Sequence, residues 1–307
     1  MEATSDRVPA SVRGLLPAIL SILVFILGRE FLRQLFGDIN SLPGPLFIVY
    51  LLMMALVFLG MILVGIYTAA RLERSKFSEF RPNVDREWRR TFVSGVVISL
   101  LAISISWGWG VCRGFRSIEL VSVGVRSPEG TMVTAVVILA ATGMFFVNMT
   151  MEEVIYRRIM LDNFIKGLAA RGLSRKAAAS LAMVGSLVAF GLLHTVYRGG
   201  GIVAIDAALT GTTFAFTYLL TGKLALPMGV HFGRHITTVL GGKSYGVVDL
   251  IAVGEVTKNT LTANLEVEFV QIGVVCLLTS MWVYQQRGSI QIQPIIYQPP
   301  TRHSQSD

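Results

Sequence analysis

The chain has 307 residues, of which 53% are hydrophobic and only 15% charged, and its mean hydropathy is +0.62. A soluble domain carries about 25% charged residues, so this composition argues against a soluble enzyme and indicates an integral membrane protein. The net charge of +8 lies mainly in the connections between apolar segments, which points to membrane topology rather than to nucleic acid binding.

Eight apolar segments follow one another along the chain, each of about the 20 residues that cross the hydrocarbon core of a bilayer. We therefore predict an all-α fold, a polytopic integral membrane bundle of about eight transmembrane helices. The predicted spans cover residues 14–36, 44–70, 91–112, 131–157, 178–198, 201–222, 224–242 and 266–285. Residues 1–285 then form one membrane-embedded domain, and the polar stretch 286–307 is predicted to be a disordered tail.

The distribution of lysine and arginine predicts the orientation, because cytoplasmic connections are enriched in these residues. The connection 71–90 carries seven basic residues and the connection 157–176 carries six, whereas 37–44 carries none. Residues 113–130 carry three and residues 243–265 carry two. We expect both termini and the two basic connections on the cytoplasmic side, in agreement with an even number of spans.

Charged and imidazole side chains inside apolar segments are candidates for a functional site, since a membrane interior penalises them. Glu152 and Glu153 lie near the end of the fourth apolar segment. Three of the four histidines, His194, His231 and His235, also lie in apolar surroundings. A single histidine of this kind is more often a packing residue, but three of them together with a glutamate pair favour a site.

An antiparallel helical hairpin would bring Glu152 and His194 to one level. Glu152 lies 21 residues before Leu173, in the polar turn ARGLSRK, and His194 lies 21 residues after it. Ser174 is a candidate N-cap for the second helix of this hairpin. The spacing therefore predicts that the first glutamate and the first histidine meet.

The depth of the site depends on the arginines that follow the glutamates. Glu153 and Arg157 are four residues apart on one helical face, and we interpret them as an ion pair that neutralises buried charge. If Arg157 and Arg158 mark the cytoplasmic boundary, Glu152 lies about 8 Å below it. His231 lies eight residues beyond Lys223, at the cytoplasmic end of the turn before it, and is therefore about 12 Å deep. The site is then expected to be shallow and open to the cytoplasm, and the fifth helix must end early, near YRGGG.

Three short motifs occur in order along these segments. EEVIYR, from Glu152 to Arg157, resembles the EExxxR motif of the CAAX prenyl protease 2-type family, also called CPBP intramembrane peptidases. FGLLH, from Phe190 to His194, resembles its FxxxH motif, and HFGRH, from His231 to His235, stands where the family has HxxxN or HxxxD. The resemblance covers roughly residues 131–242. The histidine at the final position, His235, departs from the family pattern.

The resemblance implies an eight-helix, metal-independent glutamate peptidase with a cavity open to the cytoplasmic side and no cofactor. By position, it implies that Glu152 is the general base and that His194 shares the water. His231 and His235 would stabilise the oxyanion. The residues implied to support the site are Glu153, Arg157 and Phe190.

The chemistry of these residue types fits peptide hydrolysis, which needs a positioned base and fixed donors aimed at a tetrahedral oxyanion. The sequence contains no HExxH motif, no phosphate-binding loop and no serine or cysteine in a nucleophile context. We therefore predict a membrane-bound endopeptidase. We expect its partners to be the lipid bilayer and a membrane-associated peptide or protein substrate, and the sequence does not distinguish prenylated CAAX-type proteins from other membrane peptides.

Three other interpretations remain open. Glu152, His194, His231 and His235 could form a three-histidine, one-carboxylate zinc site, which would make the protein a membrane metallopeptidase. The chain could also be a non-catalytic membrane scaffold or a bacteriocin-immunity-type protein of the same fold. A transporter that uses these residues as a proton relay is the third interpretation, but no inverted repeat is detectable.

Overall fold

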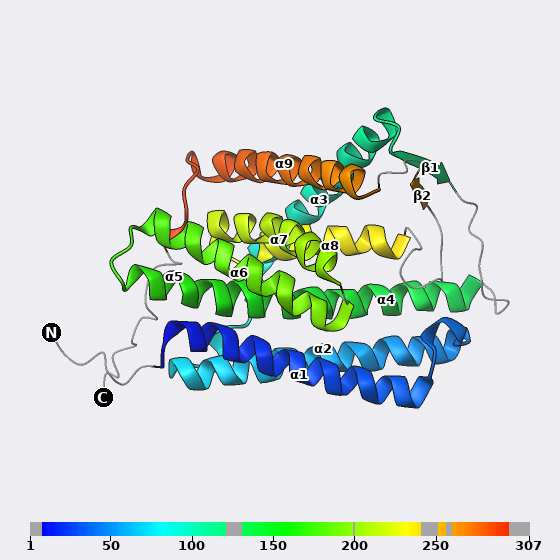
Figure 1. The fold of residues 1–307 in the computed structure, drawn as a ribbon, viewed down its shortest axis with the longest axis horizontal. Helices are drawn as coiled ribbons and strands as arrows, with labels where there is room; N and C mark the ends of the chain where they lie inside the picture. The colour runs from blue at the N-terminus through cyan, green and yellow to red at the C-terminus, as the bar shows by residue number, and fades with distance from the viewer. Residues whose placement is uncertain (1–7, 121–130, 199, 241–250, 256–259, 295–307) are drawn as a thin grey trace.

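The structure, a computed structural model, describes residues 8–120, 131–198, 200–240, 251–255 and 260–294. Most of the long helices run along one common direction and form a bundle, which α3 crosses obliquely (Figure 1). The N-terminal end of α1 and the C-terminal end of α9 lie at the same end of this bundle. The predicted all-α membrane fold is confirmed, with the addition of one short two-stranded sheet.

Seven helices of the described chain are long and apolar enough to cross a membrane. Six of them are single α-helices: α1 (Ala10–Phe36), α2 (Gly44–Glu73), α3 (Arg86–Cys112), α6 (Arg175–Arg198), α7 (Gly201–Thr221) and α9 (Thr260–Arg287). The seventh is continuous through three segments: α4 (Thr131–Glu152), the π-helical η3 (Glu153–Leu161) and α5 (Asp162–Ala169).

The eighth predicted span corresponds to α8 (Ala225–Leu240), which has only 16 residues. It packs against α3, α4 and α7, and its described side chains are all buried or half-buried. Many large apolar side chains of α1, α2, α6 and α9 are exposed instead, as expected for lipid-facing helices. α8 can therefore be short because other helices surround it.

Close contact between α8 and α3 depends on small residues. A Cβ atom at Gly229 would collide with the Phe92 carbonyl oxygen and lie 2.9 Å from Gly95 Cα. A Cβ atom at Gly233 would lie 2.6 Å from Ser99 Cβ. Glycines spaced by four residues allow two membrane helices to approach backbone to backbone. This contact fixes the helix that carries two of the candidate histidines.

The fourth span is longer than predicted. Its helix continues past residue 157 to Ala169, and the turn after it leads into α6, so that α5 and α6 form a helical hairpin. The Ser174 hydroxyl accepts a hydrogen bond from the Ala177 N–H at 3.3 Å, which confirms the predicted N-cap. α6 ends at Arg198, close to the predicted stop near YRGGG.

Two further features complete the described chain. Strands β1 (Arg116–Leu120) and β2 (Ile251–Glu255) pair antiparallel, at the end of the bundle opposite the outer ends of α1 and α9 (Figure 1). Hydropathy does not predict this sheet, because both strands lie in connections.

In the predicted tail, α9 continues to Arg287 and the Gln293 N–H donates to the Leu219 carbonyl at 3.0 Å. Residues 295–307 of that prediction lie outside the described residues.

Candidate active site

The two glutamates lie where the fourth helix changes its winding. α4 ends at Glu152, and the π-helical segment η3 begins at Glu153. π-helical turns are uncommon in proteins and frequently occur at functional sites. Both side chains are buried, with 3% of Glu152 and none of Glu153 exposed. Carboxylates inside an apolar helix require polar partners, and these come largely from α6 and α8.

Glu152 lies between two imidazole rings. Its Oε1 is 3.7 Å from His194 Nε2, and its Oε2 is 3.8 Å from His231 Nε2. Both distances exceed those of a direct hydrogen bond. A water molecule can bridge groups at this separation. The prediction that Glu152 and His194 meet across the hairpin therefore agrees with the structure.

The tautomer of His194 follows from its backbone contact. His194 Nδ1 lies 2.8 Å from the Phe190 carbonyl oxygen, one helical turn earlier. A carbonyl oxygen only accepts, so Nδ1 carries the hydrogen and donates. In neutral His194 the lone pair is then on Nε2, which is the nitrogen directed at Glu152. The Phe190 ring, 4.1 Å from the imidazole between centroids, also holds His194 in place.

His231 contacts both glutamates. Its Nδ1 lies 2.9 Å from Glu153 Oε1, while its Nε2 faces Glu152. The Phe214 ring stacks on the imidazole, with centroids 4.1 Å apart and an interplanar angle of 11°. Glu153 thus orients the ring through one nitrogen and leaves the other directed at the Glu152 carboxylate.

His235 belongs to the same stack of rings. Its ring centroid lies 4.8 Å from that of His231 and 4.5 Å from that of Phe145, with interplanar angles of 24° and 21°. The side chain is 8% exposed and lines the cavity described below. The structure therefore brings together all four residues of the predicted catalytic set: Glu152, His194, His231 and His235.

Arg157 is a buried cation behind the site. Its Nε lies 3.5 Å from Glu153 Oε2, which matches the predicted ion pair. The guanidinium also lies over the rings of Phe190, at 4.7 Å, and Phe214, at 5.5 Å. Its Nη2 donates to the Gly211 carbonyl at 3.4 Å. This arginine therefore neutralises Glu153 and connects η3 to α6 and α7.

Whether Arg157 and Arg158 mark the cytoplasmic boundary stays a prediction, but the structure shows what each arginine contacts. Only 2% of Arg157 is exposed, so this residue lies in the protein interior. Arg158 donates to Asp162 Oδ2 at 3.0 Å and to the Glu79 carbonyl at 3.1 Å. Tyr218 donates to the other oxygen of Asp162 at 3.0 Å. Because the helix continues to Ala169, about 25 Å of helix separates Glu152 from its end.

A cavity of ≈ 440 Å³ opens beside Glu152. Its walls come from α4, α6, α7 and α8. The lining residues that belong to the predicted set are Glu152, Phe190, His194, His231 and His235. A second cavity of ≈ 210 Å³, between α1, α2 and α4, meets the other side of Glu152 and Phe145 and is lined mainly by methionines and aromatic rings.

Among the cavity-lining residues that sequence reasoning did not identify, two stand out by their contacts. One is Phe214, which contacts both His231 and Arg157. The other is Arg234, whose Nη1 lies 3.0 Å from Glu268 Oε1, an oxygen that also accepts from Thr210 at 2.8 Å. A charged residue inside the HFGRH motif was a visible signal for Arg234. The position of Phe214 in an apolar helix gives no such signal.

The alternative of a zinc site would need metal ligands that lie close together. Among the residues that the structure describes, no group of three or more His, Cys, Asp or Glu side chains is arranged to hold a metal ion. Metal independence remains a prediction, and a chelator experiment tests it below.

Comparison with known families gives a match over the segment that builds the site. The sequence model described as "Type II CAAX prenyl endopeptidase Rce1-like" matches residues 133–237, which include Glu152, His194, His231 and His235. Comparison with curated proteins and with solved structures gave no match. The matched segment begins in α4 and ends in α8, and thus contains every helix that contributes a candidate catalytic residue. The chain is therefore a multi-pass membrane protein whose residues 133–237 match the sequence model of the type II CAAX prenyl endopeptidase Rce1-like family.

Proposed function

We propose that the protein is an intramembrane endopeptidase that hydrolyses a peptide bond of a membrane-associated polypeptide, with Glu152 activating the water. Family membership supports a membrane protease at the general level. The position of the Glu152 carboxylate, 3.7 Å from His194 Nε2 and 3.8 Å from His231 Nε2, carries the glutamate mechanism. A carboxylate and an imidazole at this separation can hold one water molecule between them.

The first step uses Glu152 and His194 as two acceptors for the same water. Neutral His194 presents its Nε2 lone pair, because its Nδ1–H is bound to the Phe190 carbonyl. With both hydrogens held, a lone pair of the water oxygen is free to attack the scissile carbonyl carbon. Glu152 takes the proton as the new C–O bond forms. It then gives this proton to the leaving amine as the C–N bond breaks.

The oxyanion needs a donor, and His231 is placed to supply it. Glu153 accepts from Nδ1 of this ring, so a protonated imidazole would have a carboxylate on one side and Nε2–H available on the other. The buried cluster of Glu152, Glu153 and Arg157 contains two carboxylates and one permanent cation. His235, stacked on His231 at the cavity wall, is the second candidate donor.

Replacement of the base tests this proposal directly. We expect Glu152→Gln to reduce kcat by about 10²–10⁴-fold, the usual contribution of a general base. Glutamine has the same shape and can still bond the flanking groups, so the thermal unfolding temperature in detergent should change little. Peptide hydrolysis is measured by mass spectrometry on a verified membrane substrate.

The control variant is Glu266→Gln, which removes a half-buried carboxylate that is paired with Arg113 and does not line the cavity. This variant should retain full turnover. Near-normal hydrolysis by Glu152→Gln would rule out the glutamate mechanism. No hydrolysis by the wild type, on substrates from the native membrane, would favour the non-catalytic scaffold.

A further inference from the structure

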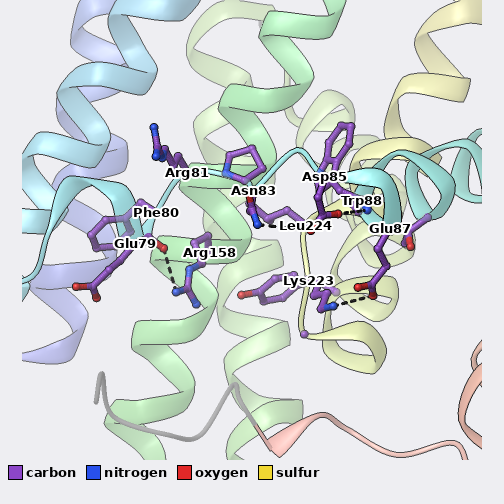
Figure 2. Close-up of a pocket in the computed structure, with 15 residues that line it drawn as sticks. Glu79, Phe80, Arg81, Asn83, Asp85, Glu87, Trp88, Arg158, Lys223 and Leu224 are labelled. Atoms are coloured by element: carbon purple, nitrogen blue, oxygen red, sulfur yellow. Dashed lines mark hydrogen bonds and ion pairs between the residues drawn. The ribbon is translucent and has the colours of Figure 1, made fainter. Parts of the chain in front are cut away.

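A pocket of ≈ 270 Å³ lies where α3 and α8 begin and α7 ends (Figure 2). Its walls come from the α2–α3 connection, the first turns of α3, the α7–α8 turn and η3. None of its lining residues lines the cavity beside Glu152. The ends of membrane-spanning helices lie at the level of the lipid headgroups. Small-molecule sites usually begin at about 300 Å³, so this pocket fits a headgroup-sized ligand rather than a whole lipid.

Basic and acidic side chains line this pocket in equal number. The basic ones are Arg81, Arg158 and Lys223, and the acidic ones are Glu79, Asp85 and Glu87. Their formal charges cancel, so the lining as a whole attracts neither a simple anion nor a simple cation. A ligand that carries one positive and one negative group matches such a lining best.

Arg158 presents a positive charge in a fixed position. Its Nη1 donates to Asp162 Oδ2 at 3.0 Å, and its Nη2 donates to the Glu79 carbonyl at 3.1 Å. Tyr218 donates to the other oxygen of Asp162, which fixes that carboxylate in turn. A guanidinium has five N–H donors, and these two bonds use only part of them. The remaining donors suit a phosphate group, which arginine binds with good geometry.

Lys223 and Glu87 lie on the side of the pocket opposite Arg158, as Figure 2 shows. Their ion pair measures 2.8 Å, and the two side chains are 59% and 70% exposed. An exposed pair of this kind contributes little to stability, so a ligand can separate it. A zwitterion that enters between the two residues gives each a new partner. Its anionic group accepts from the Lys223 ammonium, and its own ammonium donates to Glu87.

Trp88 adds a donor without an acceptor to the wall of the pocket. Its Nε1 is buried, and none of the described residues accepts a hydrogen bond from it. Buried N–H groups without an acceptor are rare in native proteins. An oxygen atom of a ligand at this wall would supply the acceptor. The indole also stacks on Phe92, with ring centroids 5.1 Å apart, so its fluorescence can report on the pocket.

We infer that this pocket binds a phosphate joined by a short chain to a primary ammonium, which is the phosphoethanolamine group. Arg158, Lys223 and the Trp88 N–H bind the phosphate, and Glu87 accepts from the ammonium. A quaternary ammonium has no N–H to donate and is usually held by aromatic rings, so phosphocholine fits less well. The same group occurs in phosphatidylethanolamine and in the soluble glycerophosphoethanolamine. The inference does not depend on the proposed peptidase function.

Lipid binding to the full-length protein in detergent tests this inference. Phosphatidylethanolamine, phosphatidylcholine and phosphatidylglycerol with the same acyl chains compete at equal concentration, and native mass spectrometry measures which lipid is retained. We expect phosphatidylethanolamine to be preferred in the wild type. Glu87→Gln and Lys223→Gln should each weaken its binding by about 10-fold, the effect of one lost hydrogen bond to a charged group. Both side chains are exposed, so the fold should persist.

Glu266→Gln and Lys176→Gln are the matched controls, because they remove the same charges outside this pocket. Both should bind lipid like the wild type. Equal retention of the three lipids, or a preference for phosphatidylglycerol, would overturn the inference. Unchanged binding in both Glu87→Gln and Lys223→Gln would do the same.

A titration with glycerophosphoethanolamine distinguishes the two sources of the group. Saturable change in tryptophan fluorescence, absent in Trp88→Phe, would support the site and identify a soluble ligand. Retention of phosphatidylethanolamine without any response to glycerophosphoethanolamine would support the site and identify the membrane lipid. Absence of both responses would overturn the inference.

Discussion

Two adjacent carboxylates have different surroundings in this molecule. Glu153 is fully buried, with the Arg157 guanidinium 3.5 Å from one oxygen and His231 Nδ1 2.9 Å from the other. Glu152 instead faces a cavity and has imidazole nitrogens at 3.7 and 3.8 Å. When neighbouring titratable groups differ in this way, their chemical roles usually differ as well. The geometry favours Glu153 as the residue that orients His231 and Glu152 as the residue that reacts.

The departure of His235 from the family motif gives a prediction at the same scale. If His235 is an oxyanion donor, His235→Asn should retain most of the turnover, because an amide N–H can take the same place. His235→Ala should reduce turnover by about 10²–10³-fold, the usual effect of removing one such donor. Initial rates on one peptide substrate compare the three proteins.

A metal site predicts a different pattern for the same variants. An asparagine amide is a poor zinc ligand compared with imidazole, so Asn and Ala would then be equally damaging. A chelator would also inactivate the wild type, and added zinc would restore it. We expect no effect of the chelator. Loss of activity in His235→Asn together with zinc-dependent recovery would replace the glutamate mechanism with a metallopeptidase.

The sequence predicted the residues of the site better than their contacts. Charged and imidazole groups stand out in an apolar chain because the membrane penalises them. For this reason Glu152, His194 and His231 were identifiable without a structure. Phe214 was not, since an apolar side chain in an apolar helix is the expected background. Its importance comes only from packing, which places it against His231 and Arg157.

At the scale of elements, hydropathy predicted most of the helices and missed how two of them are built. η3 was not predictable, because its sequence EVIYRRIML has no mark that separates π from α winding. α8 has 16 residues, which is short for a membrane span, yet it lies inside the bundle. A helix surrounded by other helices does not have to match the bilayer thickness. The requirement for about 20 apolar residues applies to helices that face lipid, such as α2 and α9.

The contact between α8 and α3 yields a prediction for this element. We expect Gly229→Ala to lower the free energy of unfolding by about 1–3 kcal/mol, because the added methyl group would overlap the Phe92 carbonyl and force the helices apart. Activity should fall with it, since α8 carries His231 and His235. Thermal unfolding in one detergent measures the change in stability.

Gly273→Ala is the matched control for this substitution. Gly273 lies in α9, and no atom lies within 4 Å of the place where its Cβ would be. Alanine is also the better helix former, so this variant should be at least as stable as the wild type. Equal stability of the Gly229 and Gly273 variants would contradict the role given to the close contact.

At the scale of the whole molecule, the depth of the site and the side of the membrane on which it opens stay predictions. The arginines after the glutamates suggested a site close to the cytoplasmic surface. In the structure, Arg157 is covered by two aromatic rings, and Arg158 is held by Asp162 and the Glu79 carbonyl. Charge counts describe connections well, but they do not show which arginines are buried in the protein. Tertiary contacts decide that.

The orientation of the whole bundle gives the last prediction. Because the basic connections should lie in the cytoplasm, a cysteine at Lys176, in the exposed start of α6, should react with an impermeant reagent only in inverted vesicles. A cysteine at Ser41, exposed in the connection without basic residues, should react only in intact cells. A membrane-permeant reagent should label both and serves as the control for cysteine reactivity. Labelling of Lys176→Cys in intact cells would invert the predicted topology, whereas labelling of both positions from one side would contradict helices that alternate in direction across the membrane.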